Sequence, residues 1–281
     1  MSRRHVLAHR IMALDEIASI LSAMKSLALM EIHLLGEFMT SQRQLTAGIE
    51  RAAADLLAWH PALRPPAEAA PELCVVIGSQ QGFCGDTNDA LLDYLAQRGI
   101  PALTGRWIVV GQRLSARLEN DPRMLLALPG ATVADEVPAV LQRLTREIVR
   151  LMASPDLAGR GLSALHHDPE DGAIRLRRLL PLRDLPAPRA AAFAPDLNLP
   201  PADVLRGLMQ HYLHAILNEV LYGALLAENR QREMHMERAL RRLDERRARL
   251  RLAANRQRQS DITEEIELLL LAGEMQAPAP N

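Results

Sequence analysis

A short glycine-rich segment that contains a cysteine is the first candidate for chemistry. The segment Gly78–Gly85, GSQQGFCG, follows an apolar, β-branched run and precedes a helical pattern, which is where phosphate-cradling loops stand. The segment lacks the GxGxxG spacing. A loop of this kind is more often a tightly packed turn and less often a dinucleotide-binding site. Cys84 at the start of a helix has the setting that lowers a thiol pKa and favours a nucleophile. A buried structural thiol is the commoner alternative, because no histidine or aspartate partner is identifiable for it.

Four histidines and one lysine offer no second chemical motif. His211 and His214 are three residues apart in a helical segment, and His166 and His167 are adjacent before a turn. Neither pair forms an HExxH motif, and the two cysteines of the chain form no CxxC. Lys25, the only lysine, has no glycine loop before it, which excludes a P-loop. The sequence therefore predicts no catalytic residue, no cofactor and no metal ligand.

Arginine is concentrated near the end of the chain. Between Arg230 and Arg258 there are 11 arginines and four acidic residues, and from Ser260 onward the sign of the charge reverses. A solvated charged face is one explanation. Nucleic-acid binding is another, but aromatic residues make up only 3% of the chain, which leaves few stacking platforms and mainly phosphate contacts. A protein partner lined with carboxylates is the specific interpretation that the pattern favours.

Two long helices must position these residues. Residues 2–59 contain no proline, and His60-Pro61 ends the pattern. The apolar spacing of three and four residues predicts a coiled-coil seam that later slips in phase. Its residues are Leu14, Ile17, Leu21, Met24 and Ala28, followed by Ile32, Leu35, Met39, Leu45, Ile49, Ala52, Leu56 and Trp59.

Residues 201–273 read as a second long helix. Its predicted seam, interrupted by Arg246, comprises Met236, Ala239, Leu243, Leu250, Ala253 and Gln257. Helices of this length bury their apolar stripes best against each other. A chain that leaves and re-enters the same middle domain makes them antiparallel.

The middle of the chain, residues 72–185, alternates strand and helix patterns. The expected elements are a strand at 73–79, a helix from Asp86, a strand at 107–111, a helix at 137–152 and two strands around the turn 168–172. Stretches rich in Pro and Ala, 61–71 and 186–201, flank this segment as linkers. The predicted fold class is mixed α+β and α/β: a long antiparallel two-helix coiled coil with an inserted small Rossmann-like α/β domain.

Three separated segments resemble the gamma subunit of the F-type ATP synthase. They are ILSAMKSLALME at 20–31, VIGSQQGFCGDTNDAL at 76–91 and NRQRQSDITEEIELLLLAGE at 255–274. The middle segment is similar to the family pattern S-D-R-G-L-C-G-G-x-N, and the last to N-K-A-R-Q-A-x-I-T-x-E. The matching residues are Gly82, Cys84, Gly85, Asn88, Asn255, Arg258, Gln259, Ile262, Thr263 and Glu265. Gln80-Gln81 depart from the family's acidic-basic pair, and Asp86 stands where a second glycine is usual.

The resemblance implies a rotor subunit with no active site of its own. Such a subunit sits in the bore of a ring of alpha and beta subunits, rests on the membrane c-ring and also contacts the epsilon subunit. By position, Met24, Lys25, Arg258, Gln259 and Thr263 are expected to meet the ring. No nucleic-acid partner is implied.

The expected location is the cytoplasmic face of a bacterial inner membrane, peripheral and without a direct membrane span. The apolar run 268–272 is far too short to cross a bilayer, and charged residues interrupt the apolar ones near the N-terminus. The departures also resemble the alternative, ion-pumping F-type ATPases. A small α/β enzyme using Cys84 and a coiled-coil nucleic-acid-binding protein are the two other functions that the residues leave open.

Overall fold

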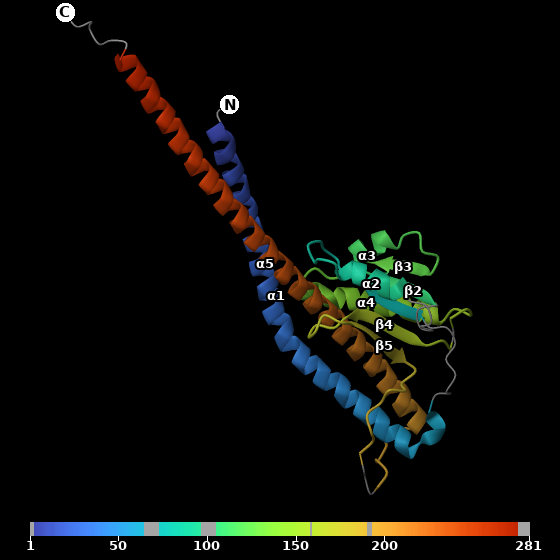
Figure 1. The fold of residues 1–281 in the computed structure, drawn as a ribbon. Helices are drawn as coiled ribbons and strands as arrows, with labels where there is room; N and C mark the ends of the chain where they lie inside the picture. Colours follow the sequence, from blue (N-terminus) through green and yellow to red (C-terminus); the bar gives the residue numbers. More distant parts are fainter. Residues whose placement is uncertain (1–2, 65–72, 97–104, 158, 190–192, 275–281) are drawn as a thin grey trace, which may run out of the picture. The chain divides into compact units, whose positions relative to one another are not determined.

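The computed structural model describes residues 3–64, 73–96, 105–157, 159–189 and 193–274, with the side chains of 3–5 and 269–274 excepted. Two long helices dominate it: α1 (Arg3–Trp59) and α5 (Pro201–Glu274) (Figure 1). Helix α1 ends before Pro61, where a short 3-10 helix η1 (Pro61–Leu63) begins, and α5 begins at a proline, which fits the first turn of a helix. Most of the first predicted linker, residues 65–71, and residues 190–192 of the second lie outside the described residues.

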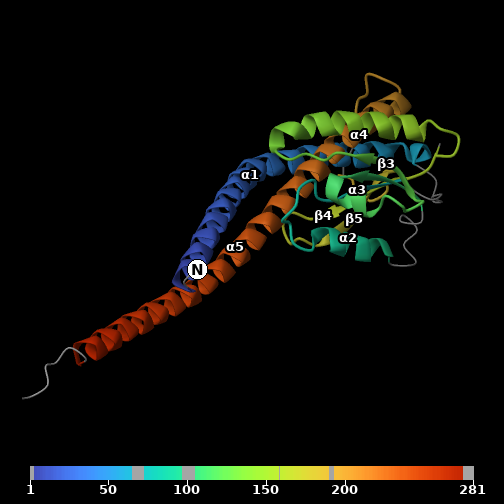
Figure 2. The same cartoon turned by 90° about the horizontal axis from the view of Figure 1, so that it is seen from above.

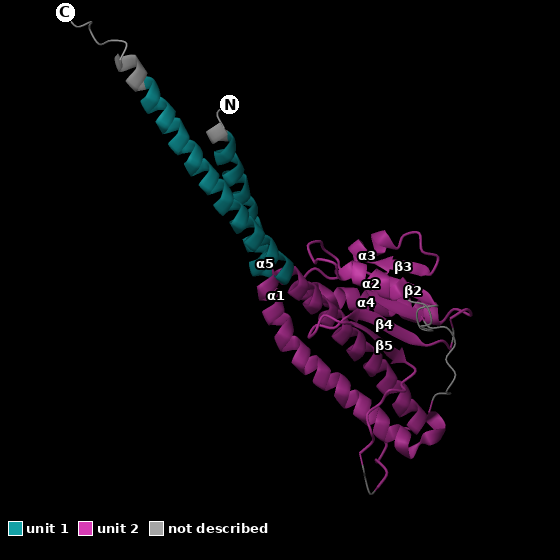
Figure 3. Ribbon diagram, in the orientation of Figure 1, with its two compact units in different colours: residues 1–27, 234–281 teal, residues 28–233 magenta. Residues whose placement is uncertain are grey.

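The chain forms two compact units, and each long helix contributes to both (Figure 3). Unit 1 consists of residues 1–27 and 234–281, and unit 2 of residues 28–233. The domain boundaries expected from the sequence, 2–59, 72–185 and 201–273, follow chain segments rather than packing. They therefore remain a prediction.

Unit 2 contains a five-stranded sheet in the order β3-β2-β1-β4-β5. The strands are β1 (Leu73–Ile77), β2 (Arg106–Val110), β3 (Met124–Leu128), β4 (Leu162–His167) and β5 (Ile174–Leu180). The first four are parallel to one another, and β5 pairs antiparallel with β4 through a tight turn. The helices between them are α2 (Thr87–Ala96), α3 (Gln112–Arg117), a 3-10 helix η3 (Ala134–Glu136) and α4 (Val137–Met152).

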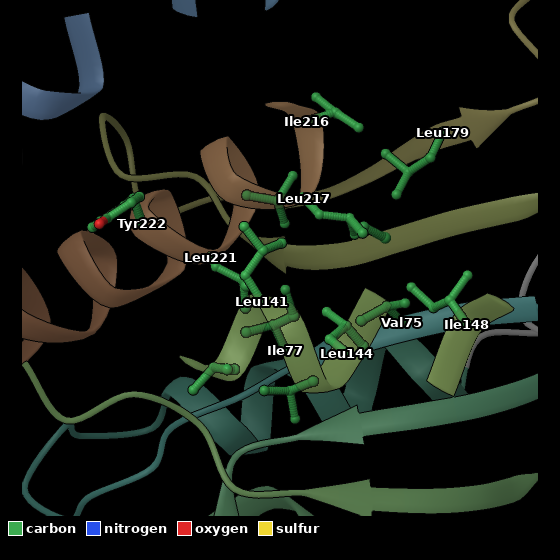
Figure 4. Packing of buried hydrophobic residues seen from close by; sticks show 14 of the residues in the cluster. Val75, Ile77, Leu141, Leu144, Ile148, Leu179, Ile216, Leu217, Leu221 and Tyr222 are labelled. Atoms are coloured by element: carbon green, nitrogen blue, oxygen red, sulfur yellow. The ribbon is translucent and has the colours of Figure 1, made fainter. Parts of the chain in front are cut away.

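Helices cover both faces of this sheet. On one face, alternate residues of β1 and β2 pack against α4 and the unit 2 part of α5, which places Val75, Leu144 and Leu221 in one cluster (Figure 4). On the other face, Cys74, Val76 and Trp107 pack against α2 and α3. Figure 2 shows α4 and α2 on opposite sides of the strands. Strands buried on both faces read as continuous apolar runs, and this is why β1 was recognisable in the sequence.

Within each unit the two long helices run antiparallel in one register. In unit 1, Asp15 pairs with Arg247 and Lys25 pairs with Glu237, so the residue numbers of both pairs add to 262. In unit 2, Met39 lies against Gly223, and these numbers add to the same total. The inserted α/β fold and the antiparallel long helices predicted from the sequence are confirmed.

The seam itself differs from the sequence prediction. Every residue at a strict four-three spacing along α1 is buried or half-buried: 7, 11, 14, 18, 21, 25, 28, 32, 35, 39, 42, 46, 49, 53 and 56. The predicted phase slip is therefore wrong, and Ile17, Leu45 and Trp59 are exposed. On α5 the seam runs through Arg247 and Ala254 instead of Arg246 and Ala253. Apolar residues alone do not mark this seam, because ion pairs and small residues occupy part of it.

Candidate functional site

The glycine-rich loop predicted to be of interest connects β1 to α2 at the carboxyl end of β1. Strand β1 pairs with β2 on one side and with β4 on the other. In open α/β sheets, the crevice at such a point is where ligands bind. Gly78 packs so tightly here that a Cβ atom would lie 2.5 Å from the Cβ of Leu114. The loop is therefore a rigid element beside the position where a phosphate group would sit in a nucleotide-binding protein.

A carboxylate of the chain itself occupies that position. The backbone N–H of Gln80 donates to Oε2 of Glu228 at 3.2 Å, and that of Gln81 donates to Oε1 at 3.2 Å. Glu228 belongs to α5 and is only 7% exposed. Consecutive backbone N–H groups of a loop form an anion-binding concavity. Here they bind Glu228, which explains how a phosphate-type loop serves as an attachment point for a helix.

Arg232 completes a buried polar cluster around Glu228. Its Nη2 lies 2.5 Å from Oε1 of Glu228, and its Nη1 donates to Oδ1 of Asn229 at 2.6 Å. Burial raises the pKa of the Glu228 carboxyl, while the charge of Arg232 and the backbone N–H donors of the loop oppose that rise. The cluster holds one negative and one positive charge in direct contact, so it is electrically balanced.

Cys84 lies against this cluster and has the opposite character to the one expected. Its Sγ lies 3.7 Å from Oε1 of Glu228 and 3.6 Å from Nη2 of Arg232. Burial, followed by the charge of Glu228, raises the pKa of the Cys84 thiol to about 12. The predicted lowering of this pKa is wrong, because the thiol is enclosed beside a carboxylate. A protonated thiol is a poor nucleophile, so the geometry gives the enzyme alternative no support.

Gln80 fixes the far side of the loop. Its side-chain Oε1 accepts the backbone N–H of Gln112 at 3.0 Å and that of Gly130 at 2.7 Å. A neutral amide oxygen therefore connects the loops that follow β1, β2 and β3. The departure from the family's acidic residue at this position preserves an acceptor for backbone N–H groups.

The histidines are divided between core and surface. His166 and His167 are buried at the end of β4, whereas His211 and His214 are exposed on α5. Among the residues that the structure describes, no group of three or more His, Cys, Asp or Glu side chains has the arrangement needed to hold a metal ion.

The five residues expected to contact a partner lie at two separate places in unit 1. Met24 and Lys25 are half-buried on α1, and Lys25 forms an ion pair with Glu237. Arg258, Gln259 and Thr263 are exposed on α5. In the observed register Lys25 lies opposite residue 237, so the two groups are about 30 Å apart along the helix axis. The structure brings Met24 and Lys25 together and keeps them apart from the other three.

Helix α5 continues beyond the start of α1. The register places residue 259 opposite Arg3, the first described residue of α1. Beyond it, three large apolar side chains are exposed: Ile262 by 46%, Ile266 by 52% and Leu268 by 67%. Residues 269–271, which the sequence also marks as apolar, lie outside the described side chains. Within the described residues, α5 beyond Gln259 has no opposing residue of α1 and carries an exposed apolar surface.

Sequence reasoning missed the residues that hold the cluster and the seam together. Glu228 and Arg232 stand four apart on α5, a spacing that suits an ion pair on one helix face. That signal was present but is common on solvated helices. Asp15 and Arg247 were invisible as a pair, because their proximity depends on the helix register.

Helix α1 is unusually apolar for a helix with a water-exposed side. Within its described part, Val6–Trp59, an 18-residue window has a mean hydropathy of 1.4, and this is the one stretch of the described residues that meets the length and composition criteria for a membrane span. Core helices of soluble proteins pass the same test, so this finding is weak evidence for a span. It does show that much apolar surface on α1 remains uncovered within the described chain.

Comparisons with known proteins are consistent with this architecture. A family model described as ATP synthase matches residues 4–269. No curated protein sequence matches the chain. Two solved structures of the Euglena gracilis mitochondrial ATP synthase are similar to it. One is of the rotor, with TM-score 0.60 and 14% identity over 92% of this chain and 98% of that one. The other, of OSCP, F1 and the c-ring, has TM-score 0.58 and 14% identity over 99% and 98%.

A third solved structure, of the central stalk and c-ring of the Tetrahymena thermophila mitochondrial ATP synthase, is also similar. It has a TM-score of 0.58 and 15% identity over 78% of this chain and 99% of that chain. At 14–15% identity these three likenesses show the fold, and the family model shows the family.

Proposed function

The chain belongs to the gamma family of F-type ATP synthases, whose members are central-stalk rotor subunits, and we propose that it couples ion flow to conformational change at catalytic sites on beta subunits. The family is structural, and its partners include the membrane c-ring and the catalytic subunits. The subunit is peripheral to a membrane-bound complex. The proposal includes three further points. An epsilon subunit is another partner, the membrane is a bacterial inner membrane, and the chain has no catalytic residue.

The observation that carries the proposal is the uncovered end of α5. A lone helix with exposed Ile262, Ile266 and Leu268 is not stable in water on its own, since the stability of most helices comes from packing of an apolar face. Clusters of exposed apolar side chains mark interaction sites. A ring of subunits that encloses the helix end from all sides would bury this surface.

Torque requires a surface that differs around its circumference. Exposed arginines of α5, Arg249, Arg251 and Arg256 among them, alternate with exposed apolar residues such as Leu252. A ligand shifts a conformational equilibrium only by its differential affinity for the two states. An asymmetric helix that presents a different side to each of three beta subunits supplies such a difference, because acidic loops would meet arginine at one orientation and apolar side chains at another.

The contact residues proposed for this role are Met24, Lys25, Arg258, Gln259 and Thr263. Arg258 and Gln259 are exposed at the level where α1 begins, so their side chains are available to a surrounding ring. Lys25 is already engaged by Glu237, and we assign it a contact that includes this pair rather than the lysine alone.

Affinity purification of the natively tagged chain from its host tests the proposal. We expect alpha subunits, beta subunits and a c-ring to be recovered with it and the preparation to hydrolyse ATP. The variant with Ile262, Ile266 and Leu268 changed to Gln should recover less of the catalytic ring. A matched control changes three exposed apolar residues of unit 2, Leu125, Val133 and Val149, to Gln. Elution of the wild-type chain alone, under conditions that preserve membrane complexes, would refute the proposal.

A further inference from the structure

The loop that binds Glu228 is held in shape by contacts that do not involve that carboxylate. Oδ1 of Asn88 accepts the backbone N–H of Ser79 at 3.1 Å, and Nδ2 of Asn88 donates to Oγ of Ser79 at 2.7 Å. On the other side, Oε1 of Gln80 accepts the backbone N–H of Gly130 at 2.7 Å. The two backbone N–H groups that bind Glu228 are therefore preorganised, and their direction does not depend on the presence of the glutamate side chain.

Arg232 also has a contact that keeps its guanidinium in place without Glu228. Its Nη1 donates to Oδ1 of Asn229 at 2.6 Å, and Nδ2 of Asn229 donates to the carbonyl oxygen of Leu225 at 3.0 Å. Arg232 is 5% exposed and Asn229 is 2% exposed. Arginine stays charged in proteins, so the cluster contains a fixed, buried positive charge. Such a charge is strongly unfavourable unless an anion lies beside it.

Three kinds of donor converge on the position of the Glu228 carboxylate. They are the two backbone N–H groups of the loop, the guanidinium of Arg232 and the Sγ of Cys84, which lies 3.7 Å from Oε1. Burial raises the pKa of the Cys84 thiol to about 12, so the thiol is neutral and adds no negative charge. With Glu228 shortened, these groups would surround a space with one positive charge and no counter-ion. That arrangement suits a single monoanion.

We propose that the loop N–H groups of Gln80 and Gln81, together with Arg232, form a carboxylate-binding site whose built-in ligand is Glu228, and that a free monocarboxylate of the size of acetate binds there once this side chain is shortened. Glu228→Ala removes one methylene carbon and the carboxylate group, which are the same heavy atoms that acetate contains. In the wild-type chain the glutamate fills the site, so free carboxylates do not enter it. The attachment of α5 to the sheet is therefore a ligand-type bond, independent of the rotor proposal.

Urea unfolding of Glu228→Ala in acetate and in chloride tests the site. The full-length chain carries Gln at positions 262, 266 and 268, so that the exposed end of α5 does not cause association. The measurements use sodium acetate and sodium chloride of equal ionic strength near neutral pH. We expect the ratio of folded to unfolded chain to rise by about tenfold at about 100 mM acetate relative to chloride, which corresponds to a Kd on the order of 10 mM.

Three matched chains separate binding at this site from a general effect of acetate on stability. In Glu228→Gln the uncharged side chain still fills the space, so acetate should give no gain over chloride. The chain with the native Glu228 should likewise show no gain, because its own carboxylate occupies the site. Glu228→Ala combined with Arg232→Met lacks the positive charge and should lose the response to acetate.

Two results would overturn the proposal. One is an equal stability of Glu228→Ala in acetate and in chloride. The other is a gain in acetate that is as large in Glu228→Gln as in Glu228→Ala, because the effect would then not require an open site. If Glu228→Ala does not fold in chloride, refolding from urea decides in the same way. Helical circular dichroism that returns in acetate alone supports the site, and its failure to return in either salt refutes it.

Discussion

Glu228 and Arg232 form an ion pair at 2.5 Å in which the arginine and glutamate side chains are only 7% and 8% exposed. One turn of α5 carries both residues, and Glu228 uses its two oxygens to bind the glycine-rich loop that follows β1. The position at which many α/β proteins hold a phosphate is thereby occupied by a side chain of the chain's own helix. A helix attached in this way cannot turn within unit 2 without breaking bonds to the sheet.

Removal of the carboxylate should be strongly destabilising. In Glu228→Ala, Arg232 is left as a buried charge without its counter-ion and two backbone N–H groups lose their acceptor, so we expect the free energy of unfolding to fall by about 3 kcal/mol. Urea denaturation followed by circular dichroism measures this. Glu245→Ala, at an exposed position of the same helix, should change it by less than about 0.5 kcal/mol. Equal stability of the two variants would mean that the cluster does not hold the loop.

The Cys84 thiol should be unreactive in the folded chain. Its pKa is raised from 9.0 to about 12, so at pH 8 it remains protonated. The thiol pKa is higher in the folded chain than in the unfolded chain, so the free energy of unfolding depends on pH. The contribution of Cys84 to stability is fully present below pH 9 and is lost as the pH rises from 9 towards 12. Peptide mapping after iodoacetamide treatment at pH 8 should find Cys84 unmodified in buffer and modified in urea. Fast modification of the folded chain would contradict the raised pKa.

The fold was largely predictable because its signals are local and long. The absence of proline from residues 2–59 and the apolar β-branched run at β1 predicted helix and strand. Strand β3 was missed, since MLLAL consists of residues that favour helices and lacks β-branched side chains. The seam was misplaced for a different reason. A prediction from apolar residues alone places Ile17 and Leu45 in the seam, whereas the observed seam passes through Lys25, Gln42 and Thr46.

The site was less predictable than the fold, because its defining contacts join residues far apart in the sequence. Glu228 lies about 150 residues from Gln80 and Gln81, and no spacing rule relates them. Cys84 was assigned a lowered pKa from its place before α2, but burial beside Glu228 decides the direction instead. Such a contact emerges only when the topology brings α5 to the carboxyl end of β1.

The isolated chain should aggregate through the end of α5. Ile262, Ile266 and Leu268 are exposed beyond the start of α1, and apolar residues left uncovered there promote association. Light scattering of the purified chain should show large species at micromolar concentration. Changing the three residues to Gln should yield a monomer, whereas changing the exposed Leu125 and Val149 of unit 2 to Gln should not. A stable monomeric wild type would contradict this expectation.

The Asp15–Arg247 pair should fix the register of unit 1. Asp15→Arg or Arg247→Asp alone brings like charges together, and each should lower the free energy of unfolding by about 0.5–1 kcal/mol. The double variant re-forms the pair with reversed charges and should recover most of that loss, although Asp244, which also pairs with Arg247, will limit the recovery. The two single variants and the double variant are compared by urea unfolding. All are made in the chain that carries Gln at positions 262, 266 and 268. Additive losses in the double variant would show that the two side chains do not interact.

Arg258 and Gln259 should matter for turnover far more than for stability. Both are exposed on α5 where α1 begins, so their removal deletes no buried contact of the chain. A guanidinium donates a planar fork of N–H groups, and the neighbouring amide both donates and accepts, which together suit a grip on a polar loop. A contact that forms and breaks at every step must be worth only a few kcal/mol, so its loss slows the cycle without dissolving the complex.

We therefore expect Arg258→Ala with Gln259→Ala to lower ATP hydrolysis by the assembled complex by about tenfold or more, the consequence of losing about 1.4 kcal/mol of differential contact. The melting temperature of the subunit should stay within about 2 °C of the wild type. The chain provides a matched control in Gln142 and Arg143, an exposed adjacent pair of the same two residue types on α4. Changing these two to Ala should leave hydrolysis unchanged. Normal turnover and coupling in the Arg258 and Gln259 variant would remove their gripping role and leave the rotor function to depend on the apolar end of α5.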